Sequence, residues 1–230
     1  MNMEDDVQAL KNIKNRLNND VLPIIELITS EFMSGKQDNK FAKGYVPYWG
    51  LLRMSLPIAE SIGALLYDND STVQNLRAIF QNDLSSYNLN YRNLANILIM
   101  LYRHPLIHSD EIRAINTSGY HVGWSLGITN PMKHLKVIKF KEQEGRFNIH
   151  FDPEEFINDL DSLLDSLIVR AEKNEWEGKL GERYVKWTNI DLDNIEQTKK
   201  LGISKNVCEE IRAKEIIMLE ELSEDTSYPD

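Results

Sequence analysis

The chain has 230 residues, 42% of them hydrophobic, which is enough for one substantial core with a smaller appendage. Its formal net charge of -10 argues against a protein that coats nucleic acid non-specifically, because such binding depends on clustered Lys and Arg. Cys208 is the only cysteine, which excludes an intramolecular disulfide and a thiolate zinc site within one chain.

The negative charge is concentrated in the last third of the chain. Residues 1–150 carry 16 basic and 15 acidic side chains, whereas residues 151–230 carry 10 and 21. The N-terminus lacks the basic start and apolar core of a secretory signal, and no apolar run approaches the roughly 18 residues of a membrane span. We therefore expect a soluble cytoplasmic protein that does not associate with membranes.

The first half of the chain has the hydrophobic spacing of helices. Apolar residues three and four apart predict an amphipathic helix over residues 4–33, with a bend at Pro23. A second helix is predicted over residues 47–67, where Pro47 suits the first turn and Pro57 kinks the middle.

Two further helices follow after short connections. One is predicted over residues 72–85, capped by Asp70 or Ser71, and the next is capped by Asn90 and contains the apolar stretch 94–101. Four helices joined by such short connections favour an antiparallel arrangement.

The hydrophobic period changes after Ser118 and Gly119. Segments 134–140 and 146–151 are rich in Val, Ile and Phe, and the turn-forming residues 142–145 separate them. The pattern predicts a β-hairpin at about residues 134–151. Three residues of the second strand are expected to face the helices: Phe147, Ile149 and Phe151.

A clear helix start follows the hairpin. Asp152 suits the N-cap, Pro153 the first turn and Glu155 the capping box, so a helix is expected to continue to about Ile168. Beyond Gly181 the chain is polar, with short helices predicted near 194–200 and 204–222.

Arg103 and His108 flank Pro105 at the end of the most apolar helical stretch. Uncompensated polar groups at a buried edge cost on the order of 2 to 7 kcal/mol, so these side chains need a partner or a function. On an unbroken helix, residues five apart lie about 140° apart around the axis. Pro105 interrupts the helix and allows both side chains to converge on one point.

These residues resemble the signature of HEPN domains, an arginine, a polar residue, a short variable stretch and a histidine. Arg103, His104 and His108 match it in order. The segment from Tyr48 to Glu60 is similar to the long kinked helix that lines the cleft of such domains. The likeness covers about residues 4–168.

The resemblance implies a mainly α fold, an up-down helical bundle over residues 1–180 with the hairpin inserted, followed by an acidic helical extension over residues 181–230. It also implies a metal-independent endoribonuclease without cofactor, acting at a cleft between two protomers. Toxin and phage-defence proteins are common in the family, so a cognate inhibitor or defence partner is also implied. Some members have lost catalysis and serve as binding scaffolds.

One position departs from a known subgroup of the family. That subgroup has a tyrosine two positions after the histidine, where a partner antitoxin attaches a nucleotide, and this chain has Asp110 there. We do not expect regulation by that route. Asp110 and His104 are predicted to support Arg103 and His108.

The side chains of the motif are chemically suited to RNA cleavage. RNA carries its own nucleophile in the 2′-hydroxyl, so cleavage requires proton transfer and stabilisation of charge on the phosphoryl oxygens. A histidine can exchange that proton, and an arginine offers a permanent forked donor to the phosphate. Arg103 and His108 are therefore the predicted catalytic pair, and no metal is expected.

Other residues are candidates for RNA binding or support. The predicted RNA-binding residues are basic: Arg92, Lys133, Lys136, Lys139 and Lys141. An alternative for the lysines is an edge strand that they protect from aggregation. Arg53 and Glu60, seven apart on the second helix, are either supports for the catalytic pair or a structural ion pair.

Two interpretations of the whole chain remain open. The first is the endoribonuclease. In the second, the chain is a catalytically inactive HEPN-like module that binds a protein or nucleotide, and Arg103 merely pairs with Glu60 or Asp110.

Overall fold

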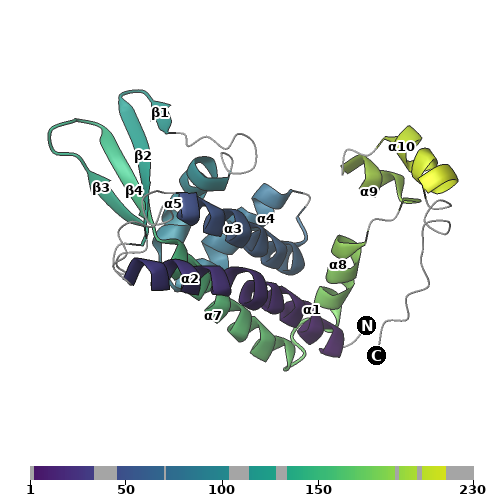
Figure 1. Cartoon of the computed structure of the whole chain (residues 1–230). Helices are drawn as coiled ribbons and strands as arrows, with labels where there is room; N and C mark the ends of the chain where they lie inside the picture. Colours follow the sequence, from purple (N-terminus) through teal and green to yellow (C-terminus); the bar gives the residue numbers. More distant parts are fainter. Residues whose placement is uncertain are drawn as a thin grey trace. The chain divides into compact units, whose positions relative to one another are not determined.

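The computed structural model describes residues 3–33, 46–69, 71–103, 114–127, 134–189, 192–200 and 204–215. The chain divides into two compact units, residues 1–184 and 185–230 (Figure 1). Helices predominate among the described residues, and all the strands described lie in the first unit.

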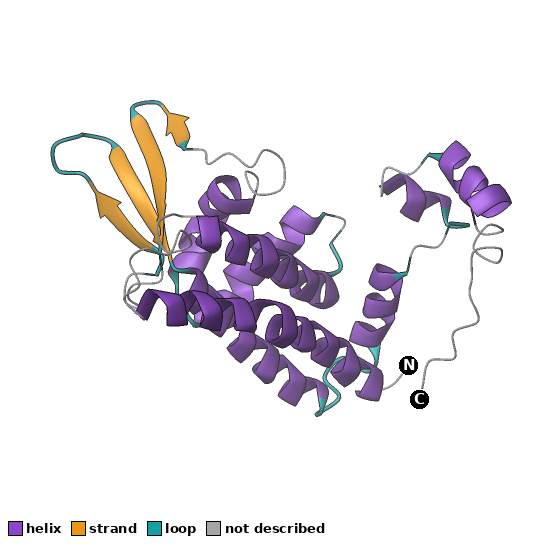
Figure 2. Ribbon diagram, viewed as in Figure 1, coloured by secondary structure: helices purple, strands orange, loops and turns teal. Residues whose placement is uncertain are grey.

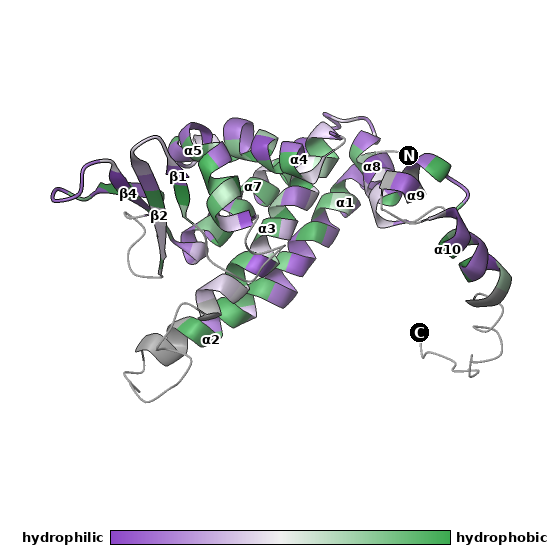
Figure 3. Cartoon of the chain, turned by 90° about the horizontal axis from the view of Figure 1, so that it is seen from above, coloured by the Kyte–Doolittle hydropathy of each residue, from purple (hydrophilic) through white to green (hydrophobic). Residues whose placement is uncertain are grey.

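The first helix is continuous over the predicted range but contains one wider turn. It consists of α1 (Met3–Arg16), a π-helical turn η1 (Leu17–Val21) and α2 (Leu22–Met33). Pro23 lacks the amide of a regular helical hydrogen bond, and the π turn ends two residues before it, at Val21. The buried residues recur three and four apart, as expected for one face of a helix: Ala9, Leu10, Ile13, Leu17, Val21 and Ile25. Figure 3 shows hydrophobic and hydrophilic residues alternating along α1.

The second predicted helix is α3 (Val46–Tyr67), with Pro57 inside it. It packs closely on α4 (Thr72–Ala78), where a Cβ added to Gly63 would lie 2.5 Å from the carbonyl oxygen of Asn75. Only a residue without a side chain permits this approach. The third predicted helix continues from α4 through η2 (Ile79–Asp83) and η3 (Leu84–Ser86).

The fourth helix consists of α5 (Asn90–Leu98) and the π-helical segment η4 (Ile99–Arg103). The prediction that Asn90 caps this helix is wrong. Asn90 is the first helical residue, and its side-chain Nδ2 donates to the carbonyl of Leu135 instead. The helix start is thereby tied to the sheet segment 134–139.

The fold class expected from the resemblance is wrong, because a four-stranded mixed sheet replaces the single inserted hairpin of an up-down helical bundle. The predicted hairpin exists as β3 (Lys136–Lys139) and β4 (Arg146–Phe151). A second hairpin, β1 (Ile115–Thr117) and β2 (Tyr120–Leu126), was not predicted. The two hairpins join through parallel pairing of β2 with β4, in the order β1-β2-β4-β3 (Figure 2).

The inner face of the sheet packs on helices. Phe147 is half-buried and Ile149 and Phe151 are buried, as predicted for the inward-facing residues of β4. Of the alternate residues, Arg146 is exposed, whereas Asn148 and His150 are half-buried rather than exposed. Tyr102 donates a hydrogen bond to the carbonyl of Ile149 at 2.9 Å, and its ring centroid lies 4.8 Å from that of Phe151. Trp124 of β2 meets Trp49 of α3 edge to face at 5.1 Å. Aromatic contacts thus join the sheet to α3 and to η4.

The predicted start of the next helix is confirmed. Asp152 is the N-cap of α7 (Pro153–Ala171), and its carboxylate accepts from the amides of Glu154 at 3.0 Å and Glu155 at 3.4 Å. The buried face of α7 completes the core through Phe156, Ile157, Leu160, Leu163, Leu164, Leu167 and Ala171.

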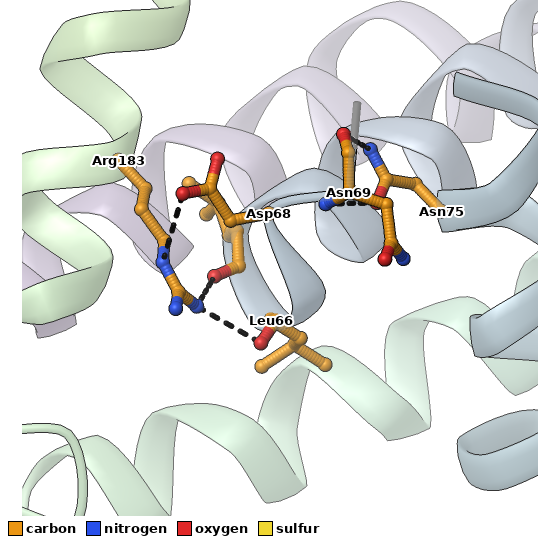
Figure 4. A network of polar contacts seen from close by, with 6 residues as sticks. Leu66, Asp68, Asn69, Asn75 and Arg183 are labelled. Carbon is orange, nitrogen blue, oxygen red and sulfur yellow. Dashed lines mark hydrogen bonds and ion pairs between the residues drawn. The ribbon is translucent and has the colours of Figure 1, made fainter. Parts of the chain in front are cut away.

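The first part of α8 (Lys179–Thr188), up to residue 184, belongs to the first unit and contacts α1 and α3. Arg183 donates through Nη1 to the carbonyls of Leu65 and Leu66, at 2.6 and 2.9 Å, and so satisfies the C-terminus of α3 (Figure 4). Asp6 is fully buried and accepts from the amides of Gly178 and Gly181. A carboxylate at the start of a helix is favoured by the helix dipole.

The second unit contains short helices, α9 (Ile195–Lys200), α10 (Lys205–Glu210) and the π-helical η6 (Ile211–Glu215). Ser204 caps α10 through the amide of Val207, and Arg212 bonds Asp193 at 2.7 Å. Across the described ranges of both units, no helix is long and apolar enough to cross a membrane.

Candidate functional site

Arg103 is the last described residue of η4, and it is buried with 8% of its surface exposed. Its Nε donates to Oε1 of Glu60 at 2.7 Å, and its Nη2 donates to Oγ1 of Thr72 at 2.8 Å. Glu60 belongs to α3 and Thr72 is the first residue of α4. One guanidinium therefore joins three separate helical elements.

The ion pair is desolvated on both sides. The side chains of Arg103 and Glu60 are 10% and 11% exposed. In such surroundings a charge is tolerated only when it is paired and hydrogen-bonded, and the planar guanidinium is suited to this role. The orientation of Arg103 is thus fixed by its neighbours rather than by solvent.

The structure brings together some of the predicted residues and separates others. Arg103 and Glu60 are in contact, whereas Arg53 of the same helix is exposed and does not share the buried environment of Glu60. His104, His108 and Asp110, together with Lys133, lie outside the described residues. Thr72 was not predicted, because a threonine at the start of a helix gives no signal in the sequence that it will contact Arg103.

The predicted RNA-binding residues have different surroundings. Lys136 and Lys139 are exposed at the two ends of β3, which is an edge strand, and Lys141 is exposed in the following turn. Arg92 bonds the carbonyl of Gln81 at 2.7 Å and Oγ of Ser85 at 3.1 Å. The Arg92 guanidinium is therefore engaged with η2 and η3, whereas the lysines face solvent.

A buried chain of hydrogen bonds holds the start of β3 against α5 and α7. Nδ1 of His134 accepts from the amide of Asp152 at 3.0 Å, so Nε2 carries the proton and donates to the Tyr91 hydroxyl at 2.8 Å. Tyr91 in turn donates to Oδ2 of Asp159 at 2.8 Å. The three hydrogen bonds therefore have the same donor-to-acceptor direction, from the backbone amide of Asp152 to the carboxylate of Asp159.

Burial shifts the ionisation of the groups in this chain. Desolvation, helped by the nearby His150, lowers the pKa of His134 to about 3. Desolvation also raises the pKa of Asp152 and of Asp159 to about 6, against the hydrogen bonds that each carboxylate accepts. His134 is thus a neutral structural histidine near neutral pH, and it is poorly suited to acid-base catalysis.

No metal site accompanies these groups in the part of the chain that is described. There, no three or more His, Cys, Asp or Glu side chains are grouped so that they could hold an ion. What the described residues do supply is hydrogen bonding and charge stabilisation by Arg103.

The buried ion pair can be tested with a matched exposed pair. Arg170 and Glu175 form the same Nε to carboxylate contact at 2.7 Å, but their side chains are 44% and 41% exposed. Glu60→Gln leaves a buried guanidinium without its counter-charge and should lower the free energy of unfolding by about 3 kcal/mol or more. Glu175→Gln should cost about 1 kcal/mol or less. Urea denaturation of both variants measures the difference, and equal costs would show that Arg103 is not held in a desolvated pair.

His134 should make the fold sensitive to acid. Because its folded pKa lies below the unfolded value of about 6.5, the unfolded chain binds the extra proton as pH falls from about 6.5 towards 3. The stability of the wild type should then fall relative to His134→Gln, by up to about 1.4 kcal/mol per pH unit. Asp152 and Asp159 act in the opposite direction, but they are present in both proteins and cancel in the difference. Urea denaturation at pH 7, 6 and 5 checks this, and parallel pH profiles would contradict it.

Comparisons with protein-family models, with curated proteins and with solved structures find no match to this chain. Its functional assignment therefore depends on its own residues and their geometry.

Proposed function

We propose that this chain is a metal-independent endoribonuclease that cleaves RNA by attack of the 2′-hydroxyl. The observation that carries the proposal is the fixed guanidinium of Arg103, bonded to Glu60 and Thr72. Arg103 directly precedes the segment 104–113, which contains His104, His108 and Asp110. The two residue types that this reaction needs are thus adjacent in the chain, and one of them is already oriented.

Each residue has a defined part in the proposed reaction. His108 takes the proton of the 2′-hydroxyl or gives one to the leaving 5′-oxygen, and Arg103 stabilises the charge on the phosphoryl oxygens. Glu60 and Thr72 are positioning residues that hold the guanidinium. The products carry a 2′,3′-cyclic phosphate and a 5′-hydroxyl, and DNA resists because it lacks the nucleophile.

The wider setting is part of the same proposal. Two protomers each contribute one Arg103 and His108 pair to a shared cleft, in the cytoplasm, in a toxin or defence context with a cognate inhibitor or partner protein. The support for this setting is the resemblance of the motif to HEPN domains. Only the sequence motif supports this setting, because the prediction of an up-down helical bundle was wrong.

A second function is favoured by the burial of Arg103. Arg103 has 8% of its surface exposed and both Nε and Nη2 already bonded, as expected for a purely structural ion pair. In this alternative the chain is a catalytically inactive HEPN-like module that acts through protein or nucleotide contacts.

Cleavage in the presence of EDTA separates the two functions. The wild-type chain should cut single-stranded RNA in EDTA, and His108→Ala should reduce the rate by about 10² to 10⁴, the usual contribution of general acid-base catalysis. An RNA of the same sequence with 2′-O-methyl groups should stay intact. His108→Ala is the informative variant because Arg103→Ala also leaves the Glu60 carboxylate buried without its counter-charge, which should lower the free energy of unfolding by about 3 kcal/mol or more.

Controls make the result decisive. Tyr87→Ser alters an exposed side chain outside the site and should leave the rate unchanged. Thermal melting of His108→Ala should match the wild type. If wild type and His108→Ala degrade RNA at the same rate, or neither does, the endoribonuclease is rejected in favour of the binding module.

A further inference from the structure

We infer that the outer face of the sheet binds the backbone of single-stranded RNA, with a phosphate held by Arg146 where it lies beside His121. This inference rests on the proposed function and extends it, because it names a docking surface for the substrate. The surface, here called the outer face, is the side of the sheet opposite Phe147, Ile149 and Phe151. Its members follow from strand register: Asn116, His121, Gly123, Ser125, Lys136, Ile138, Arg146, Asn148 and His150.

His121 and Arg146 are neighbours on this face. They are register partners in the parallel pairing of β2 with β4, so their side chains project side by side. The turn after β1 and the turn before β4 meet at this end of the sheet, where the amide of His121 donates to the carbonyl of Gly145 at 2.9 Å. A Cβ on Gly145 would lie 2.0 Å from the carbonyl oxygen of Gly119, so the two turns are in direct contact.

The imidazole of His121 is oriented by the neighbouring strand. Its Nδ1 lies 2.7 Å from Oδ1 of Asn116, an atom that can only accept, so Nδ1 carries a proton. Nε2 lies above Gly123, 3.8 Å from where a Cβ would be, and Oδ1 of Asn148 lies 2.4 Å from the same point. The missing side chain of Gly123 leaves the space in which His121 and Asn148 converge.

The guanidinium of Arg146 is also held while remaining exposed. Its Cζ lies 5.3 Å above the ring of Phe140, and its Nη1 donates to Oε1 of Gln143. A planar guanidinium fixed in this way offers its other donors to phosphate oxygens with little loss of side-chain entropy. Unlike Arg103, Arg146 can meet a ligand without any change in the core.

The charge and the exposed apolar side chains fit single-stranded nucleic acid. The four strands contain no Asp or Glu, whereas the whole chain has a net charge of -10. Glu142 and Glu144 lie in the nearby turn, but three basic side chains accompany them: Lys136, Lys141 and Arg146. Phe140 is 36% exposed and Ile138 is 43% exposed, and both can contact bases while the cations contact phosphates.

A pair of lysines on one short strand tests which face binds. Lys136 pairs with His150 and lies on the outer face, whereas Lys139 pairs with Phe147 and lies on the other face. Binding of a fluorescein-labelled 2′-O-methyl oligouridylate to the full chain is measured by fluorescence anisotropy over a range of salt. This probe cannot be cleaved by 2′-hydroxyl attack, so binding is measured apart from catalysis.

The expected pattern is specific to the outer face. Arg146→Gln should weaken binding about tenfold or more, and His121→Ala should weaken it severalfold. Lys136→Gln should reduce the slope of log K against log salt by about 0.7, and Lys139→Gln should reduce it by less. The α1 control Arg16→Gln should change little. The complementary duplex should bind more weakly than the single strand.

Two results overturn the inference, namely no binding by the wild type, or equal losses for Lys136→Gln and Lys139→Gln. Cleavage of unmodified RNA, assayed in parallel, keeps the two proposals apart. Cleavage by a wild type whose binding is insensitive to Arg146→Gln rejects the outer face alone. Binding that depends on Arg146, without any cleavage, rejects the endoribonuclease alone.

Discussion

The buried bond between Arg103 and Glu60 is the constraint on which the described site depends. The bond fixes the end of η4 against α3, and Thr72 adds the start of α4 to the same guanidinium. A desolvated ion pair gives little net stability, but removing one member is costly because the other charge stays buried. The pair therefore fixes the position of Arg103, which directly precedes in sequence the segment that carries His108.

This constraint explains why burial of Arg103 does not by itself decide between structure and catalysis. A side chain that must meet a phosphate in one orientation benefits from neighbours that hold it, since positioning before the reaction lowers the barrier. The same burial restricts the access of a phosphate to the Arg103 guanidinium. The position of the His108 imidazole relative to the remaining donors of Arg103 thus determines whether the guanidinium stabilises an oxyanion or only the fold.

Local sequence signals predicted the elements well and their assembly poorly. The spacing of apolar residues gave the helix over residues 4–33, and Asp152, Pro153 and Glu155 gave the start of α7, because these signals act within a few residues. The β1–β2 hairpin was missed, although Ser118 and Gly119, with φ of 24° and 86°, form a short turn of the kind that joins such strands. Parallel pairing of β2 with β4 depends on contacts about 25 residues apart, for which the sequence has no local pattern. For the site, Glu60 was recognised as a possible partner of Arg103, whereas Thr72 and the Asn116 to His121 bond required the fold.

The mixed sheet also changes how the cations of the chain are understood. In a simple hairpin, Lys136 and Lys139 would both protect an edge strand from aggregation, and Arg146 would be a solvent-exposed residue without a special neighbour. Parallel pairing with β2 places His121 beside Arg146, and strand β1 supplies the Asn116 that orients the imidazole. The chain thus has one guanidinium buried against a carboxylate and another exposed beside an imidazole. The exposed one can bind an anion at no cost to the core, so docking and transition-state stabilisation need not fall on the same arginine.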